Sequence, residues 1–164
     1  MFEFKPIDLE QHAPWCIRFR GDSLFCSFGS TDLFYEGEEE GSERYLAWLR
    51  QRMETIPNSC VHLWEDEQII GQIEMKKSHD DPRVGYINLF YLIPEYRGRG
   101  LGNLLDEYAA NFFKQLGCTA ARLSVTQTNL RAMKFYSKQG WQDVGPRDGN
   151  PGVHYMEKQY PTHH

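Results

Sequence analysis

The sequence predicts a mixed α/β (α+β) fold, because strand-like and helix-like segments alternate along a single chain of 164 residues. Residues 86–93 form a short apolar run rich in aromatic and branched side chains, which is typical of a buried strand. The spacing of apolar residues then changes to that of a helix over 101–116. Residues 121–139 repeat this order, with a second strand running into a second helix.

The N-terminal half predicts a strand, two helices and a hairpin. Residues 2–7 alternate and stop at Asp8, which predicts a strand and then a helix start. We predict a helix over 9–28 and a second helix with Ser42 as its N-cap. Residues 60–65 and 68–76 then predict a hairpin, with a turn at Asp66 and Glu67 and Gly71 at a bulge.

The C-terminal half predicts alternating strands and helices. Gly117 is expected to end the helix over 101–116, and Gly140 is expected to end the helix that starts at Asn129. A strand over 141–144, a Pro/Gly-rich loop over 145–152 and a last strand around 153–158 complete the chain. Because there is no internal repeat, low-complexity tract or linker, we expect a single domain over 1–164.

Composition excludes several classes of function. The net charge of -5 and the lack of a basic stripe argue against a nucleic-acid partner. The four cysteines lack CxxC spacing and the N-terminus lacks a signal peptide, so we expect reduced thiols, a cytoplasmic location and no membrane span. The six histidines show no metal-ligand spacing, so no metal site is expected.

A glycine-rich turn, RGRGLG over 97–102, connects the central strand to its helix. The first turn of a helix presents unpaired backbone N–H groups, and the helix dipole favours an anion there. The glycines let a ligand approach, and Arg97 and Arg99 would add charge-assisted contacts, which predicts a phosphate or pyrophosphate site. The alternative is a glycine-rich turn with two solvated arginines.

The spacing of this turn differs from two familiar phosphate loops. A P-loop needs Lys followed by Ser or Thr, whereas Asn103 and Leu104 follow Gly102. A dinucleotide fingerprint counted from Gly98 needs glycine or alanine where Asn103 stands. The stretch LIPEYRGRGLG instead resembles the acetyl-CoA pyrophosphate loop of the GNAT family of N-acetyltransferases, in which arginine or glutamine, then glycine, then glycine or alanine follow the fourth strand.

A second block, NLRAMKFYSKQGW over 129–141, resembles the same family. The family places an asparagine at a helix start, then an alanine, a Phe-Tyr pair, a glycine and an aromatic residue. The matching positions are Asn129, Ala132, Phe135, Tyr136, Gly140 and Trp141. The resemblance covers roughly 85–145, the expected cofactor-binding core, and the remainder agrees only in its order of elements.

The resemblance implies a GNAT fold, with a mixed, mostly antiparallel sheet of six to seven strands, splayed between strands 4 and 5 and flanked by about four helices. It implies acetyl-CoA as the acetyl donor and no metal. The backbone N–H of Leu92 would point at the acetyl carbonyl, and Leu92 and Ile93 would pair with the pantetheine arm. The implied cofactor-binding set is Leu92, Ile93, Arg97, Gly98, Arg99, Gly100, Leu101, Gly102, Asn103, Asn129, Ala132, Phe135 and Tyr136.

The resemblance also implies the catalytic groups. Tyr136 resembles the family's general acid, which protonates the sulfur of CoA, with Asn129 as its hydrogen-bonding neighbour; a core aromatic is the alternative. Some relatives carry a glutamate base on the fourth strand, but that position holds Asn88, which cannot accept a proton. Glu74 is the first candidate base, acting through water, unless it merely faces solvent; Tyr91 or His79 could substitute, or the amine could arrive neutral.

The acceptor is less defined than the donor. In the family, the segment corresponding to residues 8–60 walls the acceptor groove. Glutamates at 36, 38, 39, 40 and 43 precede or begin the second helix, and they either face solvent or attract a cationic amine. We expect direct transfer to a small primary amine in a ternary complex. The alternatives are a non-catalytic acetyl-CoA sensor or scaffold and a protein N-terminal or lysine acetyltransferase; dimers are common in the family, which leaves a homodimer open.

Overall fold

The structure, a computed structural model, describes residues 1–28, 39–147 and 149–161. These residues form two compact units, each built from separate chain segments. The first unit comprises 1–74 and 89–99, and the second comprises 75–88 and 100–164. Two long strands, β3 (Gln68–Lys77) and β4 (Val84–Leu92), contribute residues to both units.

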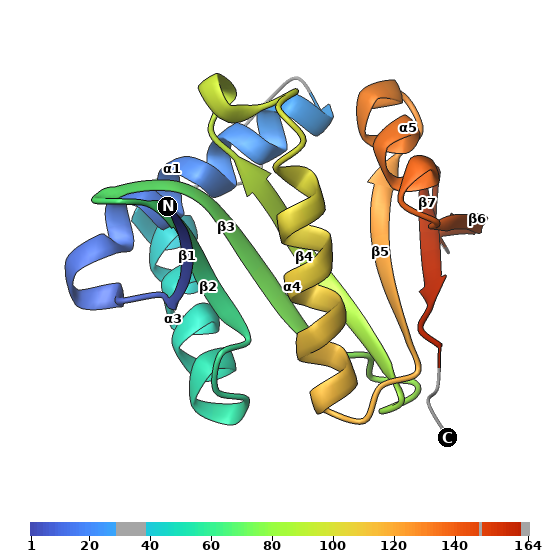
Figure 1. Ribbon diagram of the computed structural model, residues 1–164, viewed down its shortest axis with the longest axis horizontal. Helices are drawn as coiled ribbons and strands as arrows, with labels where there is room; N and C mark the ends of the chain where they lie inside the picture. The colour runs from blue at the N-terminus through green and yellow to red at the C-terminus, as the bar shows by residue number, and fades with distance from the viewer. Residues whose placement is uncertain (29–38, 148, 162–164) are drawn as a thin grey trace. The chain divides into compact units, whose positions relative to one another are not determined.

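The strands and helices follow the order that the sequence predicts (Figure 1). Seven strands hydrogen-bond in the order β1-β2-β3-β4-β5-β7-β6. The register is antiparallel between β1 and β2, β2 and β3, β5 and β7, and β6 and β7, and parallel between β4 and β5. The predicted mixed, mostly antiparallel sheet with four α-helices in the described ranges is therefore confirmed. The remaining elements are β1 (Phe2–Pro6), α1 (Leu9–Phe28), α3 (Glu39–Thr55), β2 (Cys60–Glu65), η1 (Pro94–Tyr96), α4 (Gly102–Gln115), β5 (Ala120–Thr126), α5 (Leu130–Lys138), β6 (Gln142–Arg147) and β7 (Asn150–Gln159).

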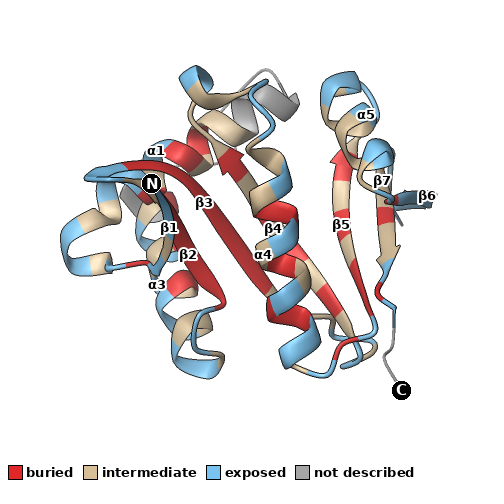
Figure 2. Ribbon diagram, in the orientation of Figure 1, coloured by how far each residue is buried: buried red, intermediate tan, exposed pale blue. Residues whose placement is uncertain are grey.

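In the first unit, helices α1 and α3 pack beside the strands β1, β2 and β3. Asp8 caps the start of α1, because its Oδ1 accepts hydrogen bonds from the N–H groups of Glu10 and Gln11 at 3.0 and 3.2 Å. Figure 2 shows that buried residues run along nearly all of β2 and β3. Two apolar clusters result: Ile7, Cys16, Tyr45, Leu49 and Cys60, and Phe19, Ile69, Leu89 and Tyr91.

In the second unit, α4 packs closely on the start of β4. A Cβ at Gly85 would lie 2.3 Å from the ring of Phe113, so only glycine permits this approach. The parallel pairing of β4 with β5 covers four positions, from Val84 with Ala120 to Ile87 with Leu123. Gly117 ends α4 in the left-handed conformation, φ +83°, as the sequence predicts.

Two predicted boundaries are wrong. Ser42 is not an N-cap, because α3 begins three residues earlier at Glu39; glutamates are good helix formers and suit a first turn, so the helix extends into the acidic run. Within the loop predicted over 145–152, residues 145–147 are instead the end of β6 and residues 150–152 the start of β7. Gly145, at φ +112°, lies at an irregularity in the register that lets pairing continue past it.

The hairpin of β2 and β3 agrees with prediction in its turn and nearly in its bulge. Asp66 occupies the turn with φ +53°. The register shifts between Leu63, opposite Gly71, and Trp64, opposite Ile69, so the extra residue is Ile70, the neighbour of Gly71. Of the acidic run, Glu36 and Glu38 lie outside the described residues, and the side chain of Glu43 is exposed.

Candidate functional site

The N-terminus of α4 presents unpaired main-chain donors. Gly98 and Gly100 adopt φ +77° and +81°, a conformation that glycine tolerates best. Within the described part of the chain, the backbone N–H groups of residues 98–102 donate to no acceptor, whereas that of Asn103 bonds to the Gly100 carbonyl at 3.2 Å. Residues 98–100 are exposed. A row of free N–H groups that is partly open to solvent at a helix start suits an anion.

Gly102 has a packing reason that the sequence did not indicate. A Cβ at this position would lie 2.6 Å from two ring carbons of Phe135 on α5. Thus, the two motifs meet at this point in the second unit, because the helix start of the first motif packs directly on an aromatic residue of the second. Asn103 adds a polar link between α4 and the end of α5, since its Oδ1 accepts a 2.5 Å bond from Gln139.

Tyr136 lies in α5 beside two aromatic rings. Its ring centroid is 5.4 Å from that of Phe135 and 6.0 Å from that of Trp141, both in edge-on geometry. Burial raises the pKa of the Tyr136 phenol well above its ordinary value, and the negative charge of Asp106 raises it further. The phenol therefore holds its proton at neutral pH, as a proton donor must.

Asn129 begins the helix that carries Tyr136. Its side-chain oxygen accepts a 3.2 Å hydrogen bond from the N–H of Ala132, so it is the N-cap of α5. This geometry accounts for the asparagine of the motif in local terms. The Leu130 side chain beside them is 75% exposed, which leaves an apolar surface at this helix start.

The end of β4 lies in the first unit and is shaped by proline. The N–H of Ile93 bonds to the carbonyl of Ile70 at 2.9 Å, and Pro94, which has no N–H, then begins the single turn η1. Arg97 follows and donates from Nε to the carbonyl of Leu92 at 2.8 Å. Leu92, Ile93 and Arg97 are therefore close together, as expected for residues around the end of one strand.

The Arg97 side chain also pairs with a carboxylate. Its guanidinium donates a 2.8 Å bond to Oδ2 of Asp22 on α1, and the same oxygen accepts a 2.5 Å bond from the Tyr91 hydroxyl. Arg99 is different, since its guanidinium lies 4.9 Å from the centre of the Tyr96 ring and is exposed. Asp22 was not identified from sequence, because no local pattern marks it.

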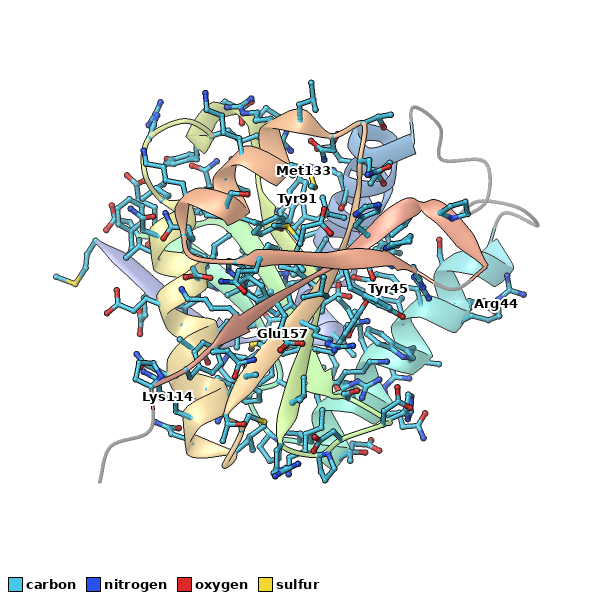
Figure 3. All side chains as sticks on the ribbon, turned by 90° about the vertical axis from the view of Figure 1, so that its right-hand side faces the viewer. Arg44, Tyr45, Tyr91, Lys114, Met133 and Glu157 are labelled. Atoms are coloured by element: carbon cyan, nitrogen blue, oxygen red, sulfur yellow. The ribbon has the colours of Figure 1, made fainter. Side chains whose placement is uncertain are left out.

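Glu74 lies in a buried polar network of the first unit, so the alternative that it faces solvent is wrong. Its Oε2 accepts hydrogen bonds from the Tyr45 hydroxyl and, at 2.7 Å, from Gln72, while its Oε1 is buried with no partner in the described chain. Burial raises the pKa of Glu74. Tyr45 lies on α3 and Tyr91 on β4 (Figure 3). Of the other candidate bases, the Tyr91 hydroxyl donates to Asp22 and His79 is exposed.

The network continues from Glu74 toward α1. Gln72 Oε1 lies 2.7 Å from Nε2 of His62, and the Cys16 sulfur lies 3.6 Å from the same nitrogen. Burial lowers the pKa of His62 to about 4, so the imidazole is neutral at physiological pH. None of Tyr45, His62 and Gln72 was identified from sequence, because their partners come from different elements.

The described ranges contain neither a metal-binding cluster nor a membrane-spanning helix. No group of three or more histidine, cysteine, aspartate or glutamate side chains in the described chain is arranged to hold a metal ion. In these ranges, helices that combine the length and apolar character needed to cross a bilayer are also absent. Cys16, Cys60 and Cys118 are buried cysteine thiols.

Comparison with known proteins decides the family. The model of the Acetyltransferase (GNAT) family matches residues 25–141. The chain belongs to the GNAT acetyltransferase family. The match includes both motifs, so the resemblance seen in RGRGLG and in NLRAMKFYSKQGW is confirmed at the level of the family.

Individual GNAT relatives match over shorter stretches. Thialysine N-ε-acetyltransferase of Bos taurus is 38% identical over 64 residues, which is 39% of this chain and 38% of that protein. An uncharacterized N-acetyltransferase of Archaeoglobus fulgidus is 36% identical over 70 residues, which is 43% of this chain and 46% of that protein. The matched segment thus spans less than half the length of these curated relatives.

Solved GNAT structures match over the whole chain in fold. The PaiA N-acetyltransferase of Thermoplasma acidophilum, in complex with coenzyme A, superposes with a TM-score of 0.70 at 22% identity, covering 98% of this chain and 99% of that one. A putative acetyltransferase of Salmonella typhimurium, with its cofactor acetyl-CoA, gives a TM-score of 0.74 at 12% identity, covering 100% and 96%. At these identities the likeness establishes the fold.

Proposed function

We propose that this protein is an acyltransferase that moves an acetyl group from acetyl-CoA to a primary amine of a small-molecule acceptor, by direct transfer in a ternary complex. The observation that carries the proposal is the row of unpartnered N–H groups over residues 98–102 at the start of α4, in which residues 98–100 are exposed. These groups would bind the pyrophosphate of acetyl-CoA, with the positive end of the helix dipole favouring its charge. The coenzyme A and acetyl-CoA in the solved relatives support this donor.

The proposed roles follow from what aminolysis of a thioester requires. The amine nitrogen forms a bond to the acetyl carbon, the carbon–sulfur bond breaks, the amine loses a proton and the sulfur gains one. The Leu92 N–H is proposed to donate to the carbonyl oxygen as charge develops there. Tyr136 is proposed to give its proton to the departing sulfur; the phenol is protonated at neutral pH, although its raised pKa makes it a weaker acid than an exposed tyrosine.

The amine's proton has two proposed destinations, Glu74 through water or solvent before the amine arrives. Complete burial of Glu74 and its bonds to Tyr45 and Gln72 favour an amine that arrives neutral. A Glu74→Gln enzyme distinguishes them. Loss of kcat/KM with loss of its acid limb would assign the proton to Glu74, and an unchanged pH profile would assign it to solvent.

The acceptor class rests on a relative's name. The bovine relative acts, by its name, on the N-ε amine of thialysine, a small amine acceptor. We therefore propose small primary amines first. The test follows free thiol release from acetyl-CoA over a panel of lysine analogues, polyamines and short peptides with free N-termini, beside a binding isotherm for coenzyme A. Turnover with a small amine supports the proposal, turnover only with peptides favours a protein acetyltransferase, and binding without any turnover favours a sensor or scaffold.

A further inference from the structure

One carboxylate on α1 holds two groups of the segment around the end of β4. Oδ2 of Asp22 accepts from the Tyr91 hydroxyl at 2.5 Å and from the Arg97 guanidinium at 2.8 Å. The side chains of Asp22 and Arg97 are 33% and 28% exposed, so the ion pair is largely shielded from water. Shielded, charge-assisted hydrogen bonds of this length are stronger than surface ion pairs.

Arg97 carries this anchor on to the main chain. Its Nε donates at 2.8 Å to the carbonyl of Leu92, five residues earlier, and its guanidinium lies 5.2 Å from the centre of the Tyr91 ring. The Tyr91 ring in turn stacks at 4.7 Å on Phe19 of α1. One side chain therefore joins α1 to the backbone of the strand end.

The end of β4 needs such a hydrogen-bonding partner because the backbone pairing between strands stops there. Ile93 is the last residue before Pro94, which lacks an N–H, and η1 turns the chain away. β3 also presses on this point, since a Cβ at Gly71 would lie 2.7 Å from the Tyr91 carbonyl oxygen and 3.1 Å from the Leu92 side chain. The strand end is thus packed on one side and hydrogen-bonded to Arg97 on the other.

We propose that Asp22 and Arg97 form a bracket that fixes the Leu92–Ile93 strand end against which the pantetheine arm lies, and that the Arg97 side chain does not bind the pyrophosphate. Asp22 and Arg97 are then positioning residues, and the exposed Arg99 is the arginine left to contact phosphate. The inference rests on the proposed function for the identity of the donor. It changes the role expected of Arg97 from its place in RGRGLG.

The test separates the two halves of coenzyme A by calorimetry. Adenosine 3′-phosphate 5′-diphosphate carries the pyrophosphate and no pantetheine arm. The bracket predicts that Arg97→Met weakens coenzyme A binding by about tenfold but changes binding of the nucleotide by less than about twofold, because only the arm depends on the strand end. A pyrophosphate contact by Arg97 instead predicts equal losses for both ligands, and that result would overturn the proposal.

Two further variants sharpen the distinction. Arg99→Met is the matched control, and it should weaken both ligands to the same degree. Asp22→Asn should reproduce the ligand pattern of Arg97→Met, whereas a pyrophosphate-binding Arg97, released from its partner, would bind coenzyme A as well as before or better. In the double variant, Asp22→Asn should add little to Arg97→Met, because both remove the same bracket.

Folding and function failures remain separable. Thermal unfolding of each variant checks the fold, and Arg97→Lys, which keeps the charge but cannot donate to both Asp22 and Leu92 with the same geometry, replaces Arg97→Met if that protein does not fold. Arg97→Lys should then show the selective loss of coenzyme A binding, and wild-type binding of both ligands would contradict the bracket. If the wild-type protein binds neither ligand, the proposed function fails, whereas equal losses in a wild type that binds both contradict only the bracket.

Discussion

The indole Nε1–H of Trp141 donates a 2.9 Å hydrogen bond to Oδ1 of Asp106, a carboxylate of α4 that is only 5% exposed. The other oxygen of Asp106 accepts a 2.6 Å bond from the ammonium of Lys158 on β7. One buried carboxylate thus joins α4, the aromatic residue that ends the second motif and a late strand of the second unit. The same charge raises the pKa of Tyr136.

Removing this carboxylate should be costly. We expect Asp106→Ala to lower the free energy of unfolding by about 3–5 kcal/mol, because it leaves the Lys158 charge and the buried indole N–H without their partner. Urea denaturation measures the change. The double variant with Lys158→Met should recover part of the loss, and an Asp106→Ala protein within about 1 kcal/mol of wild type would show that the pair contributes little.

Tyr136→Phe tests the proposed acid. We expect kcat to fall by about one to three decades while the Kd for acetyl-CoA barely changes, because the hydroxyl acts only as the sulfur departs. Thiol-release kinetics and calorimetry measure the two quantities. Tyr160→Phe is the control, since its hydroxyl is buried in the same unit and has no hydrogen-bond partner in the described chain. Unchanged turnover in Tyr136→Phe would remove this residue from the mechanism.

Gly102→Ala tests the contact between the two motifs. The new methyl group would overlap the Phe135 ring, so we expect a loss of about 1–3 kcal/mol in the free energy of unfolding. Phe135→Leu shortens the opposing side chain, and the double variant should be more stable than the sum of the two single changes predicts. Strict additivity in this cycle would mean that Gly102 is needed for some reason other than Phe135.

The buried His62 predicts a pH dependence of stability. Its pKa is about 4 in the folded protein and about 6.5 in an unfolded chain, so below pH 6.5 the unfolded state binds a proton that the folded state does not. The contribution of neutral His62 to the free energy of unfolding is complete above pH 6.5 and is lost as pH falls toward 4. Between pH 6.5 and pH 5 the loss is about 2 kcal/mol.

A variant isolates this contribution from that of Glu74, whose raised pKa acts in the opposite direction as pH rises. From pH 6.5 to pH 5, the free energy of unfolding should fall more for wild type than for His62→Gln, so the difference between the two proteins should change with pH. A difference that stays constant over this range would show that His62 titrates normally in the folded state.

Local signals in the sequence predict much of this fold. The change from strand to helix spacing over 86–116 and the glycine after it locate β4 and α4, because period and capping depend on near neighbours. Boundaries fail where residue type misleads, as at Ser42, a good cap placed inside a helix, and at Gly145, a glycine that continues a strand through an irregular register. In sequence, serine is typical of a helix cap and glycine of a turn, so neither residue type indicates that the element continues through it.

Side-chain partnerships were harder to predict than elements. Asp22 and Arg97 are 75 residues apart, and Trp141 and Asp106 are 35 apart, so no periodic or spacing signal connects them. The motifs located Arg97, Gly102 and Tyr136, but they did not predict which side chains contact Arg97 and Gly102. The close approach of Phe135 explains Gly102, and the carboxylate of Asp22 occupies part of the guanidinium expected to face phosphate.

Calorimetric titration of the purified protein with coenzyme A tests the central claim most directly. We expect saturable binding of one molecule per chain, displaced by adenosine 3′-phosphate 5′-diphosphate, because the free N–H groups at the start of α4 would hold the pyrophosphate common to both. No heat of binding with coenzyme A, together with no shift in thermal unfolding at millimolar ligand, would contradict the account.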